Sequence, residues 1–223
     1  MFAFLACGAT SGDEGTTAAA GDSAATATEA TSTTDSTAST DTGTTAAQTT
    51  AQEKESMSQY ENKVAELHTT AGEIDIRFFP DVAPNHVKNF LDLAQQGFYN
   101  GTKFHRVIPG FMIQGGDPNT KGGDPMMWGT GGSGKNVNAE FNHVKHKRGI
   151  VSMARSSSPN SASSQFFICV KPTPFLDGQY SVFGQVLEGM DVVDKIVAVP
   201  RDARDNPLDK VVMEKVTIEK RKI

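Results

Sequence analysis

One cation, two large apolar side chains and one amide lie within nine residues of this sequence, and they are Arg106, Phe111, Met112 and Gln114. An arginine keeps its proton near neutral pH, so it is a poor general base but a rigid fork of hydrogen-bond donors. Phe111 and Met112 can form an apolar wall, while the Gln114 amide can both donate and accept. This set is suited to gripping a neutral peptide rather than to cleaving one.

Three segments of the sequence resemble the cyclophilin family of peptidyl-prolyl cis-trans isomerases: FHRVIPGFMIQGGD at 104–117, SQFFI at 164–168 and FLDGQYSVFG at 175–184. The resemblance covers residues 61–220, essentially the whole globular part. It implies an isomerase that rotates the peptide bond preceding proline in polypeptide substrates. Because this rotation breaks no covalent bond, it requires no nucleophile, metal or cofactor, and we expect none of them.

The resemblance implies a role for each matching residue around Arg106. Arg106 occupies the position of the family's catalytic arginine, and Phe111 and Gln114 complete the implied catalytic set. The guanidinium would favour the twisted state of the bond, in which the imide nitrogen regains a lone pair. The implied proline pocket has four apolar walls: Phe111, Met112, Phe167 and Leu176.

Other matching residues are implied to hold the substrate on either side of its proline. The amides of Gln114 and Gln165 would hold the flanking backbone, and Ala154 with Arg155 would line the strand that pairs with the substrate. The full set implied for substrate binding is Met112, Ala154, Arg155, Gln165, Phe167, Phe175, Leu176 and Tyr180.

Three of these positions depart from the cyclosporin-sensitive eukaryotic members, which carry tryptophan, histidine and asparagine where this chain has Phe175, Tyr180 and Arg155. The segment from Ser156 to Ser164 is also one residue longer. These choices resemble the bacterial branch of the family. We expect these differences to leave isomerisation intact but to weaken cyclosporin binding, because phenylalanine at position 175 lacks the indole N–H donor of tryptophan.

The elements that must position these residues are mostly strands. Alternation of apolar and polar residues predicts a hairpin over 64–69 and 72–78, and an apolar repeat predicts a helix from Pro84 to a stop at Gly97. Further predicted strands cover 103–107, 111–114, 149–154, 165–170, 181–186 and 211–218. A glycine-rich loop is predicted over 115–138, and a second helix over 190–197. We therefore expect a mainly β fold, a closed antiparallel eight-stranded cyclophilin-like barrel capped by two helices.

A long polar segment precedes this domain. Residues 8–56 contain no Val, Ile, Leu, Met or aromatic residue and hold eight of the 26 acidic residues against one lysine, so the negative net charge of the chain, −5, comes from this segment. Such a segment cannot bury enough apolar surface to offset its ordering entropy. We expect a disordered acidic linker over 8–56, one isomerase domain over 57–223, and a monomer.

Cys7 follows an apolar run and precedes the polar linker, an order that resembles the end of a bacterial lipoprotein signal segment at residues 1–7. Only six residues precede the cysteine and none is basic, so a ragged N-terminus is the alternative. We expect lipid attachment at Cys7 and an extracytoplasmic, membrane-tethered domain that assists the folding of exported proteins. A cytoplasmic or a secreted location is the alternative.

Several other functions are disfavoured. The globular part has 18 acidic and 20 basic residues without a clustered basic face, so we expect no nucleic-acid partner. The loop 129–135 has the glycines and lysine of a phosphate-binding loop, but Asn136 replaces its Ser or Thr, so we expect no nucleotide site. His143 and His146 lack further metal ligands. A proline-peptide binding module or holdase chaperone with little turnover remains the alternative function.

Overall fold

The computed structural model describes Tyr60 and residues 62–222, and the predictions for residues 1–56 lie outside this range. Nine strands form one sheet in the order β3-β9-β1-β2-β8-β6-β7-β5-β4, and every pairing in it is antiparallel. The strands are β1 (Lys63–Thr69), β2 (Gly72–Phe78), β3 (Thr102–Lys103), β4 (Arg106–Ile108), β5 (Met112–Gly115), β6 (Ile150–Met153), β7 (Phe166–Cys169), β8 (Val182–Glu188) and β9 (Val212–Lys220).

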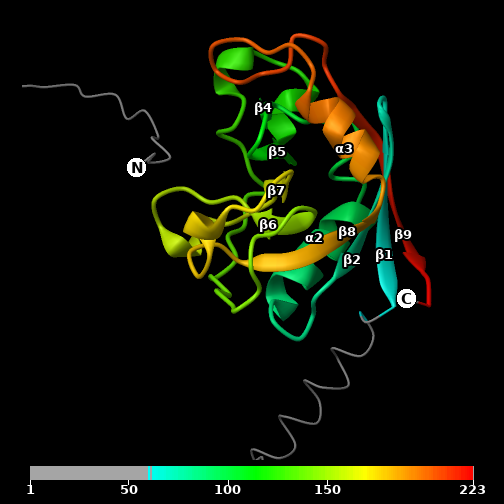
Figure 1. Cartoon of the computed structure of the whole chain (residues 1–223), viewed down its shortest axis with the longest axis vertical. Helices are drawn as coiled ribbons and strands as arrows, with labels where there is room; N and C mark the ends of the chain where they lie inside the picture. The colour runs from blue at the N-terminus through cyan, green and yellow to red at the C-terminus, as the bar shows by residue number, and fades with distance from the viewer. Residues whose placement is uncertain (1–59, 61, 223) are drawn as a thin grey trace, which may run out of the picture.

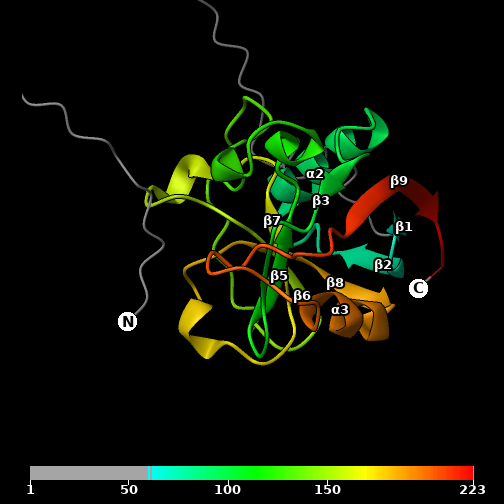
Figure 2. The same cartoon turned by 90° about the horizontal axis from the view of Figure 1, so that it is seen from above.

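Two helices pack on the curled sheet at well-separated places (Figure 1, Figure 2). The first, α2 (Pro84–Gln95), contacts β8 and β9, while α3 (Met190–Val197) contacts β2, β4 and β5. Four short 3-10 helices lie in the connections: η1 (Pro118–Lys121), η2 (Pro125–Met127), η3 (Pro159–Ser161) and η4 (Pro174–Leu176). The mainly β fold with two helices is confirmed for the residues that the structure describes. Across residues 62–222, no helix is both long and apolar enough to span a bilayer.

The prediction of a closed eight-stranded barrel is wrong. The sheet has nine strands and is open, because its hydrogen-bonded order ends at β3 and β4. The physical reason lies in residues 103–107, which form two short strands instead of one. Phe104 N–H donates to the Val211 carbonyl at 3.0 Å, whereas His105 N–H donates to the Gln114 carbonyl at 3.0 Å. Neighbouring residues thus turn to opposite ends of the sheet.

The main core lies between the sheet and the two helices α2 and α3. Val87, Phe90, Leu91 and Ala94 of α2 are buried, as their three- and four-residue spacing predicts. The Phe90 ring packs edge-on against Phe166 of β7, with ring centroids 5.4 Å apart. This packing fixes β7, whose other face contributes to the candidate site.

The start of α2 is capped by a side chain from a distant loop. Ala83 has no capping side chain of its own, and the Glu140 carboxylate instead accepts hydrogen bonds from the backbone N–H groups of Asn85 and His86, each at 3.0 Å. Burial alone would raise the pKa of Glu140, but the hydrogen bonds from His86 and Asn85 outweigh it and lower the pKa below its ordinary value of 4.5.

We expect Glu140→Gln to lower the free energy of unfolding near neutral pH by about 1–2 kcal/mol, since it weakens a charge-assisted helix cap. The folded-state pKa of Glu140 is depressed, so its carboxylate stabilises the fold above the unfolded-state pKa and this contribution is lost as pH falls through the folded-state pKa. Urea unfolding of both proteins should therefore show a gap at neutral pH that closes in acid. Glu214→Gln, at an exposed position of β9, is the control, and a gap independent of pH would contradict this account.

Candidate active site

Strand register brings together residues that are far apart in the sequence. Arg106 of β4 pairs with Gln114 of β5, and Gln114 in turn pairs with Phe167 of β7. Residues directly opposite each other on antiparallel strands project to the same side of the sheet. The register therefore places a cation, an amide and an aromatic ring in one row across three strands.

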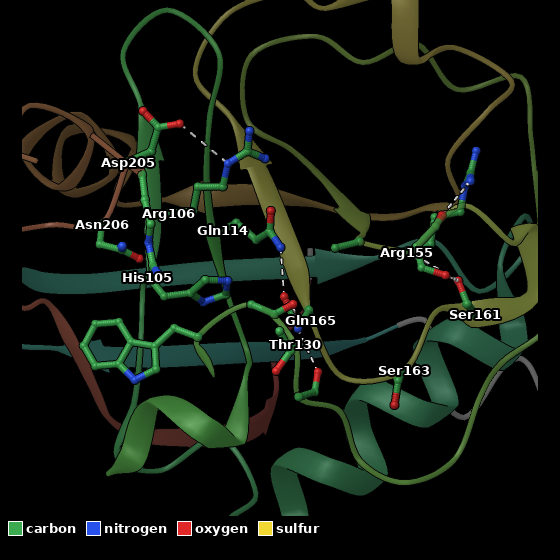
Figure 3. Close-up of a pocket in the computed structure, with 16 residues that line it drawn as sticks. His105, Arg106, Gln114, Thr130, Arg155, Ser161, Ser163, Gln165, Asp205 and Asn206 are labelled. Carbon is green, nitrogen blue, oxygen red and sulfur yellow. Dashed lines mark hydrogen bonds and ion pairs between the residues drawn. The ribbon is translucent and has the colours of Figure 1, made fainter. Parts of the chain in front are cut away.

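Arg106 occupies one wall of a cavity of about 500 Å³. Its side chain is 30% exposed, and its Nε lies 3.8 Å from Oδ2 of Asp205; Figure 3 shows the two groups facing each other. Burial lowers the pKa of Arg106, and the Asp205 carboxylate opposes that shift. Because the ordinary pKa of an arginine lies far above neutral pH, the guanidinium stays charged.

Gln165 ties the site to the glycine-rich loop. Gln114 Nε2 donates to Gln165 Oε1 at 2.8 Å, and Figure 3 shows this bond. Gln165 Nε2 then donates to the carbonyls of Gly129 at 2.9 Å and Gly131 at 2.7 Å. The two amides thus form a chain that orders the cavity wall, and their implied role of holding the substrate backbone remains a prediction.

The implied proline pocket coincides with a second, smaller apolar cluster beside the main core. Its buried members are Met112, Phe167, Cys169, Leu176 and Tyr180, and Ile108, Phe111 and Ala154 pack against them. The rings of Phe167 and Tyr180 meet edge-on, with centroids 5.7 Å apart. All four residues implied to form the proline pocket therefore lie in one cluster, next to the row that carries Arg106.

The predicted site residues fall into two groups in the structure. Arg106, Gln114, Ala154, Arg155 and Gln165 line the cavity, whereas Phe111, Met112, Phe167, Leu176 and Tyr180 form or touch the apolar cluster. Ala154 belongs to both, so the cavity and the cluster adjoin each other.

Phe175 and Arg155 occupy less central places than the other predicted residues. Phe175 is 63% exposed and touches the cluster through the Phe111 ring, with centroids 5.5 Å apart. The Arg155 guanidinium lies 4.7 Å from the centroid of the Tyr180 ring and donates to the carbonyls of Gln179, Ser156 and Ser157. Both residues lie at the rim, where they can contact a ligand without forming the floor.

Two loops for which the sequence predicted no role in the site complete the cavity. One loop contributes Trp128 and Thr130, and the other contributes Arg204, Asp205 and Asn206. The loops meet where the Arg204 guanidinium donates to the Pro125 carbonyl at 2.5 Å. No local pattern marks this contact, because it joins segments 79 residues apart.

His105 also lines the cavity. It lies within the segment 104–117, but the sequence predicted no role for it. Burial lowers the pKa of His105 to about 4, so the imidazole is neutral at physiological pH. A neutral ring here adds no second positive charge beside Arg106.

The glycine-rich loop folds around a protein carboxylate. Gly129 N–H donates to Asp117, and Gly131 N–H does so at 3.3 Å. The amides that a phosphate would need are therefore bonded to Asp117. His146, the other residue weighed for binding, has its Nδ1 3.0 Å from Asp177 Oδ1. Within the described part of the chain, no group of three or more His, Cys, Asp or Glu side chains is placed to hold a metal ion.

Residues 64–218 match the family model of the cyclophilin type peptidyl-prolyl cis-trans isomerases. A probable peptidyl-prolyl cis-trans isomerase of Brucella abortus is 47% identical over 172 residues, covering 74% of this chain and 86% of that protein. Peptidyl-prolyl cis-trans isomerase B of Escherichia coli is 46% identical, covering 68% of this chain and 97% of that protein.

Solved structures agree with these relatives. A cyclophilin type peptidyl-prolyl cis-trans isomerase of Cryptosporidium parvum, crystallised in the presence of the dipeptide Ala-Pro, superimposes with a TM-score of 0.64 at 34% identity, covering 70% of this chain and 98% of that chain. The chain belongs to the cyclophilin family, and it is a peptidyl-prolyl cis-trans isomerase.

Proposed function

We propose that Arg106 accelerates prolyl rotation by stabilising the twisted amide while the apolar cluster holds the proline ring. The barrier of about 18–20 kcal/mol comes from the partial double-bond character of the peptide bond. An enzyme lowers it by binding the twisted state better than either planar state. The observation that carries the proposal is the row of Arg106, Gln114 and Phe167 beside the apolar cluster.

The magnitude of this effect sets what the rest of the site must contribute. A charge-assisted hydrogen bond is worth about 1.5–3 kcal/mol, and about 1.4 kcal/mol corresponds to a factor of ten in rate. Arg106 alone therefore supplies about 10- to 150-fold. We assign the remainder to the cluster of Met112, Phe167 and Leu176, which would exclude water from the amide and fix the ring while the preceding carbonyl swings.

The substrates that we propose are extended, proline-containing polypeptides bound along the cavity wall. The Cryptosporidium parvum relative was crystallised in the presence of Ala-Pro, and the same class of ligand fits a site with an apolar cluster beside amides and a cation. Titration of an Ala-Pro peptide into labelled protein should shift the amide signals of Gln114, Ala154 and Gln165. Shifts confined to residues remote from the cavity would place the ligand elsewhere.

A protease-coupled assay separates turnover from holding. We expect the wild-type protein to accelerate isomerisation of a proline tetrapeptide at catalytic concentrations, since the complete Arg106 row is present. A holdase would suppress aggregation of an unfolded client but leave the isomerisation rate unchanged. That second outcome would favour the binding-module alternative over the mechanism proposed for Arg106.

We further propose a bacterial, extracytoplasmic and monomeric form tethered by a lipid at Cys7, which serves exported proteins. The support is the sequence order of apolar run, cysteine and polar spacer at residues 1–56. As a random coil, a spacer of about 50 residues would span on the order of 40 Å, which would leave the domain free to move near a membrane surface. Metabolic labelling with a fatty acid should mark the wild type and not Cys7→Ser; equal labelling of both would reject the tether.

Phe175→Trp is expected to raise the affinity for cyclosporin by about two- to twelvefold, because the indole N–H supplies a hydrogen bond worth about 0.5–1.5 kcal/mol. The exposed rim position of Phe175 accommodates the larger ring. Inhibition of the isomerase by cyclosporin measures the change, with Phe175→Tyr as a matched aromatic control. Equal inhibition of the wild type and Phe175→Trp would show that this ring does not limit binding.

A further inference from the structure

Asp205 has an unusual backbone conformation. It lies between α3 and β9 with φ of 66°, and among the residues that the structure describes it is the sole non-glycine residue with a positive φ. Glycine adopts this left-handed conformation without the steric penalty that a Cβ imposes. An aspartate at this position is therefore strained, and strain of this kind is a reason to look for a function of its side chain.

The loop around Asp205 is held in place from both sides. The Asp202 carboxylate accepts hydrogen bonds from the backbone N–H groups of Arg204 at 2.8 Å and Asn206 at 2.9 Å. On the other side, the Asp205 carbonyl accepts from Val107 N–H at 2.9 Å. Val107 directly follows Arg106 in β4, so the loop is attached to the strand that carries the arginine.

The Asp205 side chain lies between two arginines. Its Oδ2 is 3.8 Å from Arg106 Nε, and its Oδ1 is 3.1 Å from Arg201 Nε. Figure 3 shows the carboxylate directed at the Arg106 guanidinium. An arginine carries donors on separate edges of one rigid plane. A carboxylate 3.8 Å from Nε can therefore favour one orientation of that plane through the ion pair, while the terminal nitrogens act on a bound amide.

We propose that Asp205 is a positioning residue for isomerisation: its carboxylate holds the Arg106 guanidinium in the orientation that acts on the twisted prolyl bond. The inference rests on the proposed role of Arg106. It extends that role to the loop around Asp205, which lies outside the three segments that resemble the cyclophilin family. Asp205 itself does not contact the reacting atoms.

Two substitutions test the proposal. Asp205→Asn removes the charge with little change of shape, and Asp205→Gly removes the side chain and relieves the strained backbone. We expect both to lower kcat about three- to tenfold, equivalent to about 0.7–1.4 kcal/mol, with KM within about twofold of wild type. The Tm of Asp205→Gly should equal or exceed that of the wild type. Asp209→Asn, the same chemical change at an exposed position nearby, should leave kcat unchanged.

A spectroscopic readout separates positioning from catalysis. The Nε–Hε signal of Arg106 reports the mobility of its guanidinium, and we expect it to show faster motion in Asp205→Asn than in the wild type or Asp209→Asn. An unchanged signal, wild-type kcat in both Asp205 variants, or a loss of kcat matched by a loss of Tm would each overturn the inference. Absence of any rate acceleration by the wild type would instead refute the proposed function, and the Arg106 signal would still decide the positioning.

Discussion

Replacing Arg106 with alanine is expected to lower kcat/KM at least tenfold and to leave the protein folded. The guanidinium is the one group in the row of Arg106, Gln114 and Phe167 that carries a full charge, and the proposed charge-assisted hydrogen bond to the twisted amide would supply about 10- to 150-fold in rate. Arg106 is 30% exposed and lies on the edge strand β4, so its truncation opens no enclosed core cavity. The coupled proline-peptide assay measures the loss.

Arg106→Lys is the matched control for charge without the planar fork. Lysine keeps the positive charge but offers a compact ammonium in place of a rigid set of donors. We expect it to recover only part of the lost activity. Thermal unfolding of each variant should lie close to that of the wild type, and near-normal kcat/KM in Arg106→Ala would overturn the mechanism.

Phe167→Ala is expected to have the largest effect on stability among the site residues. The Phe167 side chain is 3% exposed within the apolar cluster, and its ring stacks against His146 with centroids 6.1 Å apart. Truncation of a buried phenylalanine costs about 3–5 kcal/mol, because the cavity left behind fills only partly. Urea unfolding measures this cost, and isomerisation by the folded fraction should fall, because the proposed proline pocket would lose its floor.

Phe175→Ala makes the same chemical change at the rim of the same cluster. Its ring is 63% exposed, so the loss of unfolding free energy should stay within about 0.5 kcal/mol. The contrast between the two variants therefore tests which ring forms the floor. Similar losses of stability in both would contradict the division between floor and rim.

Much of the fold could be predicted because its signals are local. The hairpin of β1 and β2 and the helix that begins at Pro84 follow from alternation and three- to four-residue periodicity, and both are confirmed. The strand predicted over 103–107 is wrong at its centre, where Phe104 and His105 bond to different strands. A local pattern cannot show this split, since tertiary pairing decides it.

The candidate site shows the same limit. Arg106, Met112 and Gln114 lie in one short segment of the sequence. Because β4 and β5 form a hairpin, these residues are also close together in the structure. Trp128 and Asp205 reach the cavity only through contacts between distant loops, and no motif marks them. The exposure of Phe175 could not be predicted either, because the pattern of apolar residues does not distinguish its exposed ring from the buried side chain of Leu176 next to it.

Exchange spectroscopy on an Ala-Pro peptide tests the central claim most directly, because it observes the cis and trans forms at equilibrium without a coupling protease. Uncatalysed interconversion takes tens of seconds or more. We predict that substoichiometric wild-type protein brings the exchange into the sub-second range and that Arg106→Ala slows it at least tenfold at equal peptide occupancy. Binding of the peptide by the wild type with exchange left at the uncatalysed rate would contradict the account.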